Sequence, residues 1–463
     1  MDIGELTAVE LCSALRSRQL SSVEVTRHYL ARAEHDICGA FVELTPELAL
    51  ARARELDRIP PAGLIHGAPL ADKDLQLRAG TRTTHGSRGW AEQPTNSDRL
   101  VAALDAAGAV SIGKTATPEF GFAAHTSSLA HGHTTIPGYP ELGAGGSSGG
   151  AAAAVAAGML PFAPGSDAGG SVRIPAAACG IVGLKPTRGR VPAQSGLGML
   201  GMLAVPGALA RTVADAALLV EAMIAGSPRR LSTLGCPPAQ LRVPQRPSRR
   251  RVGVLGGFAP WREIVDTPIG AEARGAVEAA AAALAAEGHV VAEVAVPELP
   301  GYADAFLTIW RANAAAIPMT PAQHELLEPL TRHLVDRGRE LTAGRIVAAL
   351  RALFAHEEAI VGAFEGLDAV LTPTTALPPR PIDWYPEDPW ENFLAQCRYA
   401  PHTSFVNVAG LPALSLPTWW RGGLSMSVQL IGRPGGEDAL LQLGAELERV
   451  CRPGTPPSPP GAL

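Results

Sequence analysis

Apolar residues recur at helical spacing over the first part of the chain, and polar capping residues mark where the helices begin. Thr7-Ala-Val-Glu10 and Ser21-Ser-Val-Glu24 fit the capping-box pattern, in which a Ser or Thr and a Glu three residues later satisfy each other's backbone N–H groups. The pattern predicts two helices, the first ending at about Ser17 and the second at about Glu34. Helices of this kind are typical of scaffold and not of a catalytic site.

Helix-like and strand-like patterns alternate through the rest of the chain, with glycine or proline between them. A third predicted helix begins at Pro46, and further helices are predicted over 97–107, 149–158, 212–225 and 270–287. A closing helix is predicted from about Glu437. The predicted strands cover 40–45, 109–112, 159–164, 252–255, 289–296, 369–372, 414–417 and 426–431. This alternation predicts an α/β fold in which helices cover a largely parallel or mixed sheet.

A glycine- and serine-rich segment, residues 143–192, stands out from this pattern. Two Gly-Gly-Ser clusters hold Ser147 and Ser171, and the predicted Ala-rich helix and apolar strand of residues 149–164 lie between them. Alanine favours a helix because it loses no side-chain entropy there, and Gly158 is placed to end that helix. Glycine also lets a substrate come close to backbone N–H groups. We therefore expect the fold to bring the two serines together on glycine-rich loops.

Composition narrows the class of protein. The 463 residues, 46% of them hydrophobic, can bury a large core. The formal net charge of −5 gives no electrostatic footprint for nucleic acid. The N-terminus lacks the features of a signal peptide, and the apolar runs are too short, or too rich in glycine and proline, to span a bilayer. The six cysteines have no paired spacing, so we expect reduced thiols in a cytoplasmic protein that binds neither nucleic acid nor membrane.

Two short motifs offer rival chemistries. Gly108-Ala-Val-Ser-Ile-Gly-Lys-Thr115 matches the phosphate-loop pattern, which would make the protein a P-loop nucleotide hydrolase. A phosphate loop follows a strand and opens a helix, whereas here the interior is itself strand-like and Pro118 follows soon after. Gly145-Gly-Ser-Ser-Gly149 fits the nucleophile elbow of α/β-hydrolases, but no buried strand is predicted just before it. We expect both matches to be accidental.

A histidine-bearing loop raises the question of a metal. His125, His131 and His133 lie close together in the sequence. A His-x-His pair alone is weak evidence for a metal site, and no acidic or cysteine ligand lies nearby in the sequence. The preferred interpretation is a polar loop near the mouth of an active site, with no metal.

Three motifs in order carry a resemblance to a known family. GGSSGG, DAGGSVRIP and GLKPTRGRV are similar to the signature of the amidase signature family of serine hydrolases, and the similarity extends upstream to PLADKD and downstream to VQLIGRPGGEDALLQLGAELE. The resemblance implies the amidase signature fold, a central mixed β-sheet covered by helices on both faces, as one domain over residues 1–463. N-terminal helices would occupy about 1–58, the signature core about 67–225 and a variable, substrate-facing segment about 299–400.

The resemblance also assigns a Ser-cisSer-Lys triad. Ser171 matches the nucleophile, Ser147 the bridging serine that follows a cis peptide bond, and Lys73 the terminal base, which would take the Ser147 proton as Ser147 takes that of Ser171. Such a base must be neutral, and burial lowers the pKa of a lysine whereas flanking carboxylates raise it. Strand alternation would place Asp72 and Asp74 on the face opposite Lys73. The residues alone leave open a solvated lysine between two aspartates.

Residues beside the triad match supporting roles in the family. We expect Ser148 to be a structural hydrogen-bonding residue, and Asp167 and Arg173 to hold the second serine loop by an ion pair; the other interpretation is two surface charges. No histidine, metal or cofactor is required by this scheme. The family's oxyanion hole, which stabilises the charge of a tetrahedral intermediate, matches the N–H groups of Ala168, Gly169, Gly170 and Ser171.

The acyl pocket is predicted to be lined by the loop from Gly121 to Thr126, with Phe122 and Ala123 as further contacts, and by parts of the middle segment. The stretch from Trp384 to Trp390 could cover a cleft as an aromatic loop. An apolar or aryl amide, anilide or carbamate would suit such walls. Four residues of the middle segment lie at helical spacing and belong either to the core or to the pocket, namely Tyr302, Phe306, Ile309 and Trp310.

The family includes free amidases and one subunit of a tRNA-dependent amidotransferase. The chain departs from the commonest family pattern in the segments KTATPEF, TTIPG and AVPGALAR, which disfavours the amidotransferase and leaves it as the alternative. We therefore expect an amidase-type hydrolase that cleaves a carbonyl C–N bond of a small amide or carbamate through an acyl-enzyme, as a monomer or homodimer.

Overall fold

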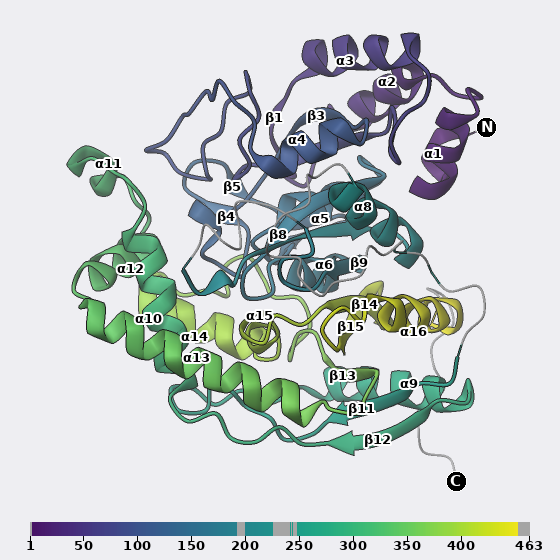
Figure 1. Ribbon diagram of the computed structural model, residues 1–463. Coiled ribbons are helices and arrows are strands. Elements are labelled where there is room, and N and C mark those ends of the chain that lie inside the picture. The colour runs from purple at the N-terminus through teal and green to yellow at the C-terminus, as the bar shows by residue number, and fades with distance from the viewer. Residues whose placement is uncertain (1, 192–199, 226–240, 242, 244–247, 452–463) are drawn as a thin grey trace.

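The N-terminal helices form where their capping residues predict them. The computed structural model describes the chain except residues 1, 192–199, 226–240, 242, 244–247 and 452–463 (Figure 1). Thr7 and Glu10 form the full capping box at the start of the first helix, whereas Ser21 only accepts the N–H of Glu24 at the second. The 3-10 turn and helices of this region are η1 (Ile3–Glu5), α1 (Ala8–Arg16), α2 (Ser22–Ala33) and α3 (Pro46–Arg58).

A three-stranded sheet follows the N-terminal helices. Its order is β1 (Phe41–Leu44), β3 (Val110–Thr115) and β2 (Pro69–Lys73), with β3 antiparallel to β1 and parallel to β2. Helix α4 (Arg99–Ala106) precedes β3, and every residue of β2 and β3 is buried. The small sheet lies beside the edge of a larger one, because β2 contacts its terminal strand β8 (Phe162–Asp167).

The larger sheet has eight strands and is mixed. Its three parallel strands lie at one edge, and every other neighbouring pair is antiparallel. The strands in spatial order are β12 (Val290–Val294), β11 (Arg251–Leu255), β13 (Ala369–Pro373), β15 (Leu424–Gly432), β14 (Ala413–Arg421), β9 (Val182–Lys185), β10 (Val205–Ala210) and β8. The predicted mixed α/β sheet is confirmed.

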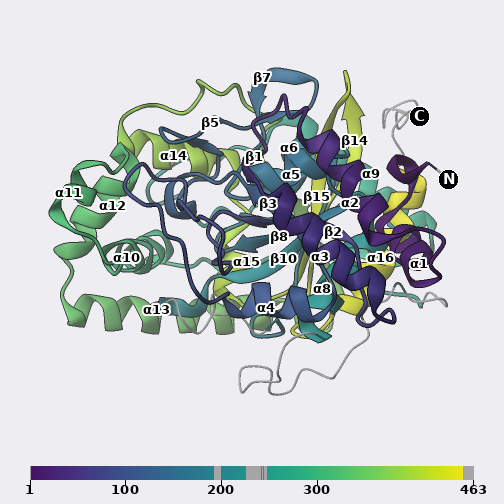
Figure 2. The same ribbon diagram turned by 90° about the horizontal axis from the view of Figure 1, so that it is seen from above.

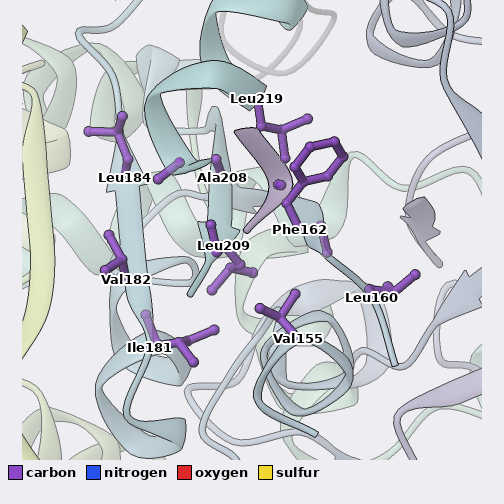
Figure 3. Close-up of a cluster of buried hydrophobic side chains, with 14 of the residues drawn as sticks. Val155, Leu160, Phe162, Ile181, Val182, Leu184, Ala208, Leu209 and Leu219 are labelled. Carbon is purple, nitrogen blue, oxygen red and sulfur yellow. The ribbon is translucent and has the colours of Figure 1, made fainter. Parts of the chain in front are cut away.

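Helices cover both faces of this sheet. On β14, Leu414 faces Gly444 of α16 (Glu437–Val450). The next residue, Ser415, pairs with Gly183 of β9, which faces Ala176 of α6 (Arg173–Cys179) on the other side. Figure 3 shows the apolar core on the strands between α5 and α8. The layer on the α6 face also contains α5 (Gly149–Ala156), and the layer on the α16 face contains α8 (Val213–Ala225) and α9 (Ala271–Ala286).

A second, mostly helical region lies at one end of the molecule, away from α1 and α16 (Figures 1 and 2). It has its own core of buried aromatic and aliphatic side chains. Its helices are α10 (Tyr302–Ala315), α11 (Pro321–Glu325), α12 (Pro329–Arg339), α13 (Ala343–Ala363), α14 (Pro389–Tyr399) and α15 (Ser404–Val408). The remaining elements are η2 (Glu119–Gly121), β4 (Ser127–Ser128), β5 (Gly132–His133), β6 (Thr135–Ile136), β7 (Tyr139–Gly143) and η3 (Leu200–Met202).

Some predicted strands differ from the observed ones. The strand expected at 159–164 is β8, which begins three residues later and continues through the polar Ser166 and Asp167 because its whole length pairs with β10. Strands β9 and β10 were not predicted. A strand does precede the apparent nucleophile elbow, but β7 is largely exposed and belongs to a two-stranded hairpin, so it is not the buried strand that the motif needs. In the described part of the chain, no helix is both long and apolar enough to cross a membrane.

Candidate active site

Lys73 is the last residue of the buried strand β2 and is itself fully buried. Its Nζ donates to Ser147 Oγ at 2.7 Å and to Ser166 Oγ at 3.1 Å. The two flanking carboxylates have other partners, as strand alternation predicts: Asp72 pairs with the Arg78 guanidinium at 2.5 Å, and Asp74 accepts from Thr84. The alternative of a solvated lysine between two aspartates is wrong.

The surroundings of Lys73 favour its neutral form. Burial lowers its pKa to about 7, and the more distant Asp167 carboxylate opposes that shift only in part. Both groups that Lys73 contacts are hydroxyls, which carry no charge to hold the ammonium form. The amine can therefore accept a proton near neutral pH.

Ser147 lies just before Ser148, the N-cap of helix α5, and follows a cis peptide bond from Gly146, as the resemblance implies. The chain here is packed too tightly for side chains. A Cβ on Gly146 would lie 2.6 Å from the backbone of His125, and one on Gly150 would lie 2.3 Å from the backbone nitrogen of Ala116 in the neighbouring β3 connection. The glycines of GGSSGG therefore let α5 approach the small sheet that carries Lys73.

The second serine loop is held by a buried ion pair. Arg173 Nη2 and Nε donate to the two oxygens of Asp167 at 2.7 and 2.9 Å, and both side chains are fully buried. Arg173 also donates to Asn407 at 2.6 Å and to the Thr403 carbonyl at 3.0 Å. Burial alone would raise the pKa of Asp167, but the adjacent guanidinium outweighs it and holds that pKa well below its usual range. The predicted ion pair is confirmed, and the alternative of two surface charges is wrong.

The four N–H groups matched to an oxyanion hole are not equivalent. The Gly170 N–H donates to the Asp167 carboxylate at 2.8 Å, so it is already used within the loop. Among the described residues, the N–H groups of Ala168, Gly169 and Ser171 have no protein acceptor. Gly169 and Ser171 also line the adjacent pocket. These three free donors can bind an oxygen that develops negative charge.

Ser171 lines the pocket, whereas Ser147 is buried and is not among the lining residues. The backbone of the two loops is joined by a bond of 3.1 Å from the Ser148 N–H to the Ser171 carbonyl. Ser148 Oγ donates to the Ser166 carbonyl at 3.4 Å, in keeping with its predicted structural role. Over the described ranges, no hydrogen bond joins the hydroxyls of Ser147 and Ser171. The structure thus shows the Lys73–Ser147 half of the expected relay.

A mainly apolar pocket opens over Ser171. Its empty volume is about 510 Å³, part of it open to solvent. The signature core, α10, α14 and nearby segments contribute its walls, which are formed by Gly121, Phe122, Ala123, Ala124, Gly169, Ser171, Ile174, Trp261, Phe306, Trp310, Phe393, Gln396, Cys397, Ala400 and Ser404. The predicted contacts Gly121, Phe122 and Ala123 are among them. Apolar walls with few polar groups are typical of a small-molecule site.

Three predicted residues or segments lie elsewhere. Thr126 does not line the pocket: its side chain is buried and accepts the Gly149 N–H at 3.1 Å. Of the four residues at helical spacing on α10, Phe306 and Trp310 line the pocket, whereas Tyr302 and Ile309 are core. The aromatic stretch from Trp384 does not line it either, and its last member Trp390 already belongs to α14. On α10, the core residue Ile309 directly precedes the pocket residue Trp310, so helical spacing in the sequence could not separate the two groups.

Ser166 and Gln396 are site residues that the sequence did not reveal. Ser166 holds the Lys73 amine, and its only sequence signal is a polar residue inside an otherwise buried strand. Gln396 accepts the Ala124 N–H at 2.8 Å and donates to Asn392 at 2.7 Å, so it fixes the pocket loop to α14. Ala124 is 272 positions away from Gln396 in the chain, so no local pattern could indicate this contact.

The rival motifs have structural roles. Lys114 lies inside strand β3, where it donates to the Gln76 carbonyl and lies 4.0 Å from Asp74, so the phosphate-loop interpretation is wrong. His125 lies over the Tyr385 ring at 4.3 Å, His131 contacts Thr84, and His133 contacts Ser127. No group of three potential metal ligands occurs among the residues that the structure describes. The five described cysteines are unpaired, and Cys236 lies outside the described residues.

Comparison with known proteins identifies the class. The sequence profile of the Amidase family matches residues 24–441 of this chain. Together with the mixed sheet and the serine-bearing loops, this match shows that the chain belongs to the amidase signature family. It is a hydrolase that acts on carbon–nitrogen bonds.

Individual relatives agree with this assignment and differ in what they act on. A protein of Mycobacterium tuberculosis named as the putative amidase AmiB2 is 36% identical to this chain, over 87% of this chain and 85% of its own. A glutamyl-tRNA(Gln) amidotransferase subunit of Nitrosococcus oceani is 32% identical over 95% of this chain and 96% of its own. Among solved structures, 6-aminohexanoate cyclic dimer hydrolase superposes with a TM-score of 0.86 at 30% identity, covering 97% of this chain and 98% of that one.

Proposed function

We propose that the protein hydrolyses amides of small molecules through a triad of Ser171, Ser147 and Lys73. The observation that carries this proposal is the buried hydrogen bond of 2.7 Å from Lys73 to Ser147, made by an amine whose pKa burial lowers to about 7. A neutral amine next to a hydroxyl is a proton acceptor in the right place for nucleophilic catalysis. Ser171 is assigned as the nucleophile because its hydroxyl lines the pocket and its loop is bonded to that of Ser147. Ser404 also lines the pocket, but it is bonded to the Tyr302 hydroxyl.

The proposed reaction has two halves. In the first, Ser147 passes its proton to Lys73 and receives that of Ser171, while Ser171 Oγ forms a bond to the substrate carbonyl carbon. The relay then reverses: a proton returns through Ser147 to the substrate nitrogen, and the C–N bond breaks to leave an acyl ester on Ser171. In the second half, water attacks the ester, and its proton takes the same route to Lys73. The carboxylic acid leaves and Ser171 regains its proton.

This route requires the hydroxyls of Ser147 and Ser171 to meet when substrate binds. Catalytic hydrogen bonds are often longer in a free enzyme and shorten in the substrate complex. The two serine loops are already tied by the backbone bond from Ser148 to Ser171, so a change of side-chain rotamer is the movement that the scheme asks for. The N–H groups of Ala168, Gly169 and Ser171 would hold the oxyanion.

The substrate class follows from the pocket. Phe306, Trp310 and Phe393 offer aromatic surface, whereas charged side chains are absent among the described residues that line it. A neutral acyl group with aromatic or aliphatic carbon fits such walls better than a charged one. We propose aryl or alkyl amides as substrates, with aryl carbamates as a related class.

The alternative is the corresponding subunit of a tRNA-dependent amidotransferase, favoured by the 32% identity to such a protein over 95% of this chain. It would act on an amide within a larger assembly. The neutral apolar pocket disfavours this alternative, because an amino acid amide carries charged groups that need partners.

A hydrolysis panel tests the proposal. The purified chain is given aryl amides, primary aliphatic amides, aryl carbamates and glutamine, with Ser171→Ala as the blank. We expect arylamine release from the aryl substrates and none from the blank. Activity on glutamine alone, together with partner subunits in pull-downs of the tagged chain, would favour the amidotransferase instead.

A further inference from the structure

A second pocket lies on the other side of the wall formed by α10 and α14. On α10, Trp310 lines the acyl pocket and its neighbour Arg311 lines the second one. We call it the cationic pocket; its residues are Arg311, His333, Arg337, Glu340, Leu341, Thr342, Arg345 and Trp390. Its empty volume is about 1030 Å³, part of it open to solvent. Helices α10, α12, α13 and α14, which surround it, lie together in both views (Figures 1 and 2).

Arginines outnumber carboxylates among the residues that line this pocket, where Arg311, Arg337 and Arg345 face Glu340. Arg345 pairs with Asp304 at 2.7 Å, and Arg337 pairs with Glu340 at 3.1 Å, both near the protein surface. Arg311 has no ion pair within the described residues, and its guanidinium lies 6.0 Å from the Trp390 ring. Burial, followed by the nearby Arg337, lowers the pKa of Arg311, and the carboxylates of Asp304 and Glu340 offset that shift only in part.

Hydrogen-bond donors in the pocket are also unused. Arg311 Nε and His333 Nε2 are buried atoms without a partner. The pocket lies at the N-terminus of α13, a helix of 21 residues, where Thr342 Oγ1 accepts only the Arg345 N–H. The N–H groups of Ala343 and Gly344 have no acceptor among the described residues. A buried donor without a partner is costly, so Arg311 Nε and His333 Nε2 indicate a missing acceptor. Ala343 and Gly344 are exposed, so their N–H groups are open to water or to a ligand.

We propose that the cationic pocket binds a small oxyanion, the carboxylate or phosphate group of a small molecule. A guanidinium matches the two oxygens of such a group, and the N-terminus of a helix attracts negative charge. The unpaired Arg311 would be the main contact, with Arg337 exchanging Glu340 for the ligand. The amphipathic wall of Trp390 would contact the carbon part of that ligand.

The position of the site suggests what the oxyanion does. Trp390 stacks on Phe393 at 5.8 Å between ring centres, and Phe393 lines the acyl pocket. An anion that holds Arg311 over the Trp390 ring would therefore also fix the position of Phe393 in the wall of the acyl pocket. The oxyanion has two possible sources: a free anion, or the distal carboxylate of an amide substrate. The interpretation as a substrate carboxylate rests on the proposed function, whereas the proposal that the cationic pocket binds an oxyanion does not.

Calorimetry with inorganic phosphate and with butyrate tests the site without any turnover. It is done at low ionic strength because salt screens exposed charges. Removing one charged donor should weaken binding at least about tenfold, so we expect this loss in Arg311→Gln and in Arg337→Gln. Arg339→Gln is the matched control, since Arg339 is an exposed residue of the same helix α12 that does not line the pocket. Circular dichroism of each variant shows that it is folded.

The outcomes separate cleanly. Binding that Arg311→Gln and Arg337→Gln lose and Arg339→Gln keeps supports the site. Absence of binding to the wild type, or equal binding by all four proteins, overturns it. Hydrolysis then identifies the source of the anion. An anilide with a distal carboxylate is compared with its methyl ester. If the carboxylate lowers KM in the wild type but not in Arg337→Gln, the anion belongs to the substrate. Equal KM values, with phosphate still bound, assign it to a free ligand.

Discussion

At the scale of single residues, three buried lysines show why burial alone does not identify a base. Burial lowers the pKa of both Lys73 and Lys185 to about 7. Lys185 donates to the Pro186 carbonyl, and Lys114 to a carbonyl near Asp74, so neither has a proton donor to act on. Among the residues that the structure describes, only Lys73 of the three lysines contacts serine hydroxyls. The contact, and not the pKa, distinguishes Lys73 as the proposed catalytic amine.

Ser166 is predicted to position the Lys73 amine. Ser166→Ala should lower kcat about tenfold with little change in KM, because one hydrogen bond of the amine is lost. That bond stabilises the ammonium form more than the neutral one, so the rise of rate with pH should shift to lower pH. Ser166→Thr keeps the hydroxyl and should restore most of the rate. An unchanged pH profile in Ser166→Ala would contradict this role.

The buried pair of Arg173 and Asp167 is predicted to hold the fold of the nucleophile loop. Arg173→Lys should lose about 3 kcal/mol or more in urea unfolding at pH 7, because a lysine cannot make the bidentate contact and leaves Asp167 short of partners. The folded state holds the pKa of Asp167 below its ordinary value of 3.8. The pair is therefore fully stabilising above that value, and its contribution disappears as pH falls through the folded pKa.

The matched control for this prediction is an exposed ion pair. Arg449 contacts Glu287 at 2.7 Å, with the arginine side chain 57% exposed. Arg449→Lys should change the unfolding free energy by less than about 0.5 kcal/mol. Equal small effects of both substitutions would show that the buried pair is not what holds the loop.

At the scale of elements, the positions of the two serines proposed as catalytic depend on how closely α5 packs. Gly150 is the test position: a Cβ there would lie 2.3 Å from the Ala116 nitrogen and 2.5 Å from the Ala40 carbonyl oxygen. Gly150→Ala should cost at least about 2 kcal/mol and lower activity, because both obstacles are backbone atoms that move little. Thermal unfolding and hydrolysis of an aryl amide measure the two effects.

Gly275, in α9, is the control for Gly150. Apart from its chain neighbours and the backbone of its own helix, no atom lies within 4 Å of the position that its Cβ would take. Gly275→Ala should stabilise the protein by about 1 kcal/mol, since alanine is the better helix former. A destabilising Gly275→Ala, or a harmless Gly150→Ala, would contradict the packing argument.

Elements were predictable from the sequence where the signal is local. Thr7 caps helix α1, and Pro46, whose fixed φ suits the first turn of a helix, is the first residue of α3. Strand β10 has the sequence VPGALA, with proline and glycine inside it, and forms only because β8 and β9 pair with it on either side. Its position depends on partners far along the chain, so short-range periodicity could not reveal it.

At the scale of the whole molecule, the acyl pocket lies where the signature core meets the helical region. Its walls come from α10 and α14 on one side and the serine loops on the other. Lys73, Ser147 and Ser171 could be predicted because each lies in a short sequence motif and the motifs follow one another along the chain in the same order as in the family. The opposite wall has no motif, so the sequence indicated the middle segment but could not separate pocket-facing Phe306 from core-facing Tyr302.

Phe306 is predicted to select aryl substrates. Phe306→Leu should raise KM for an aryl amide about three- to tenfold, because an aromatic contact is lost, and leave hydrolysis of a small aliphatic amide nearly unchanged. Phe364→Leu is the control, since Phe364 belongs to the same buried core but does not line the pocket. Steady-state kinetics on both substrates decide the matter. A similar loss on both, or in the control, would mean that Phe306 acts on stability alone.

The central claim is that a neutral Lys73 drives acylation of Ser171 through Ser147, and the pH–rate profile of the acylation burst tests it most directly. Rapid mixing with an aryl amide measures arylamine release in the wild type, Lys73→Ala and Lys73→Arg. The wild-type rate should rise with pH through about 7, where the buried amine loses its proton, and then level off. The acylation rate of Lys73→Ala should be at least about a thousandfold lower than that of the wild type. Lys73→Arg should not restore the rate, because a guanidinium stays protonated. Wild-type acylation by Lys73→Arg at pH 7 would show that residue 73 supplies only positive charge, and would contradict the account.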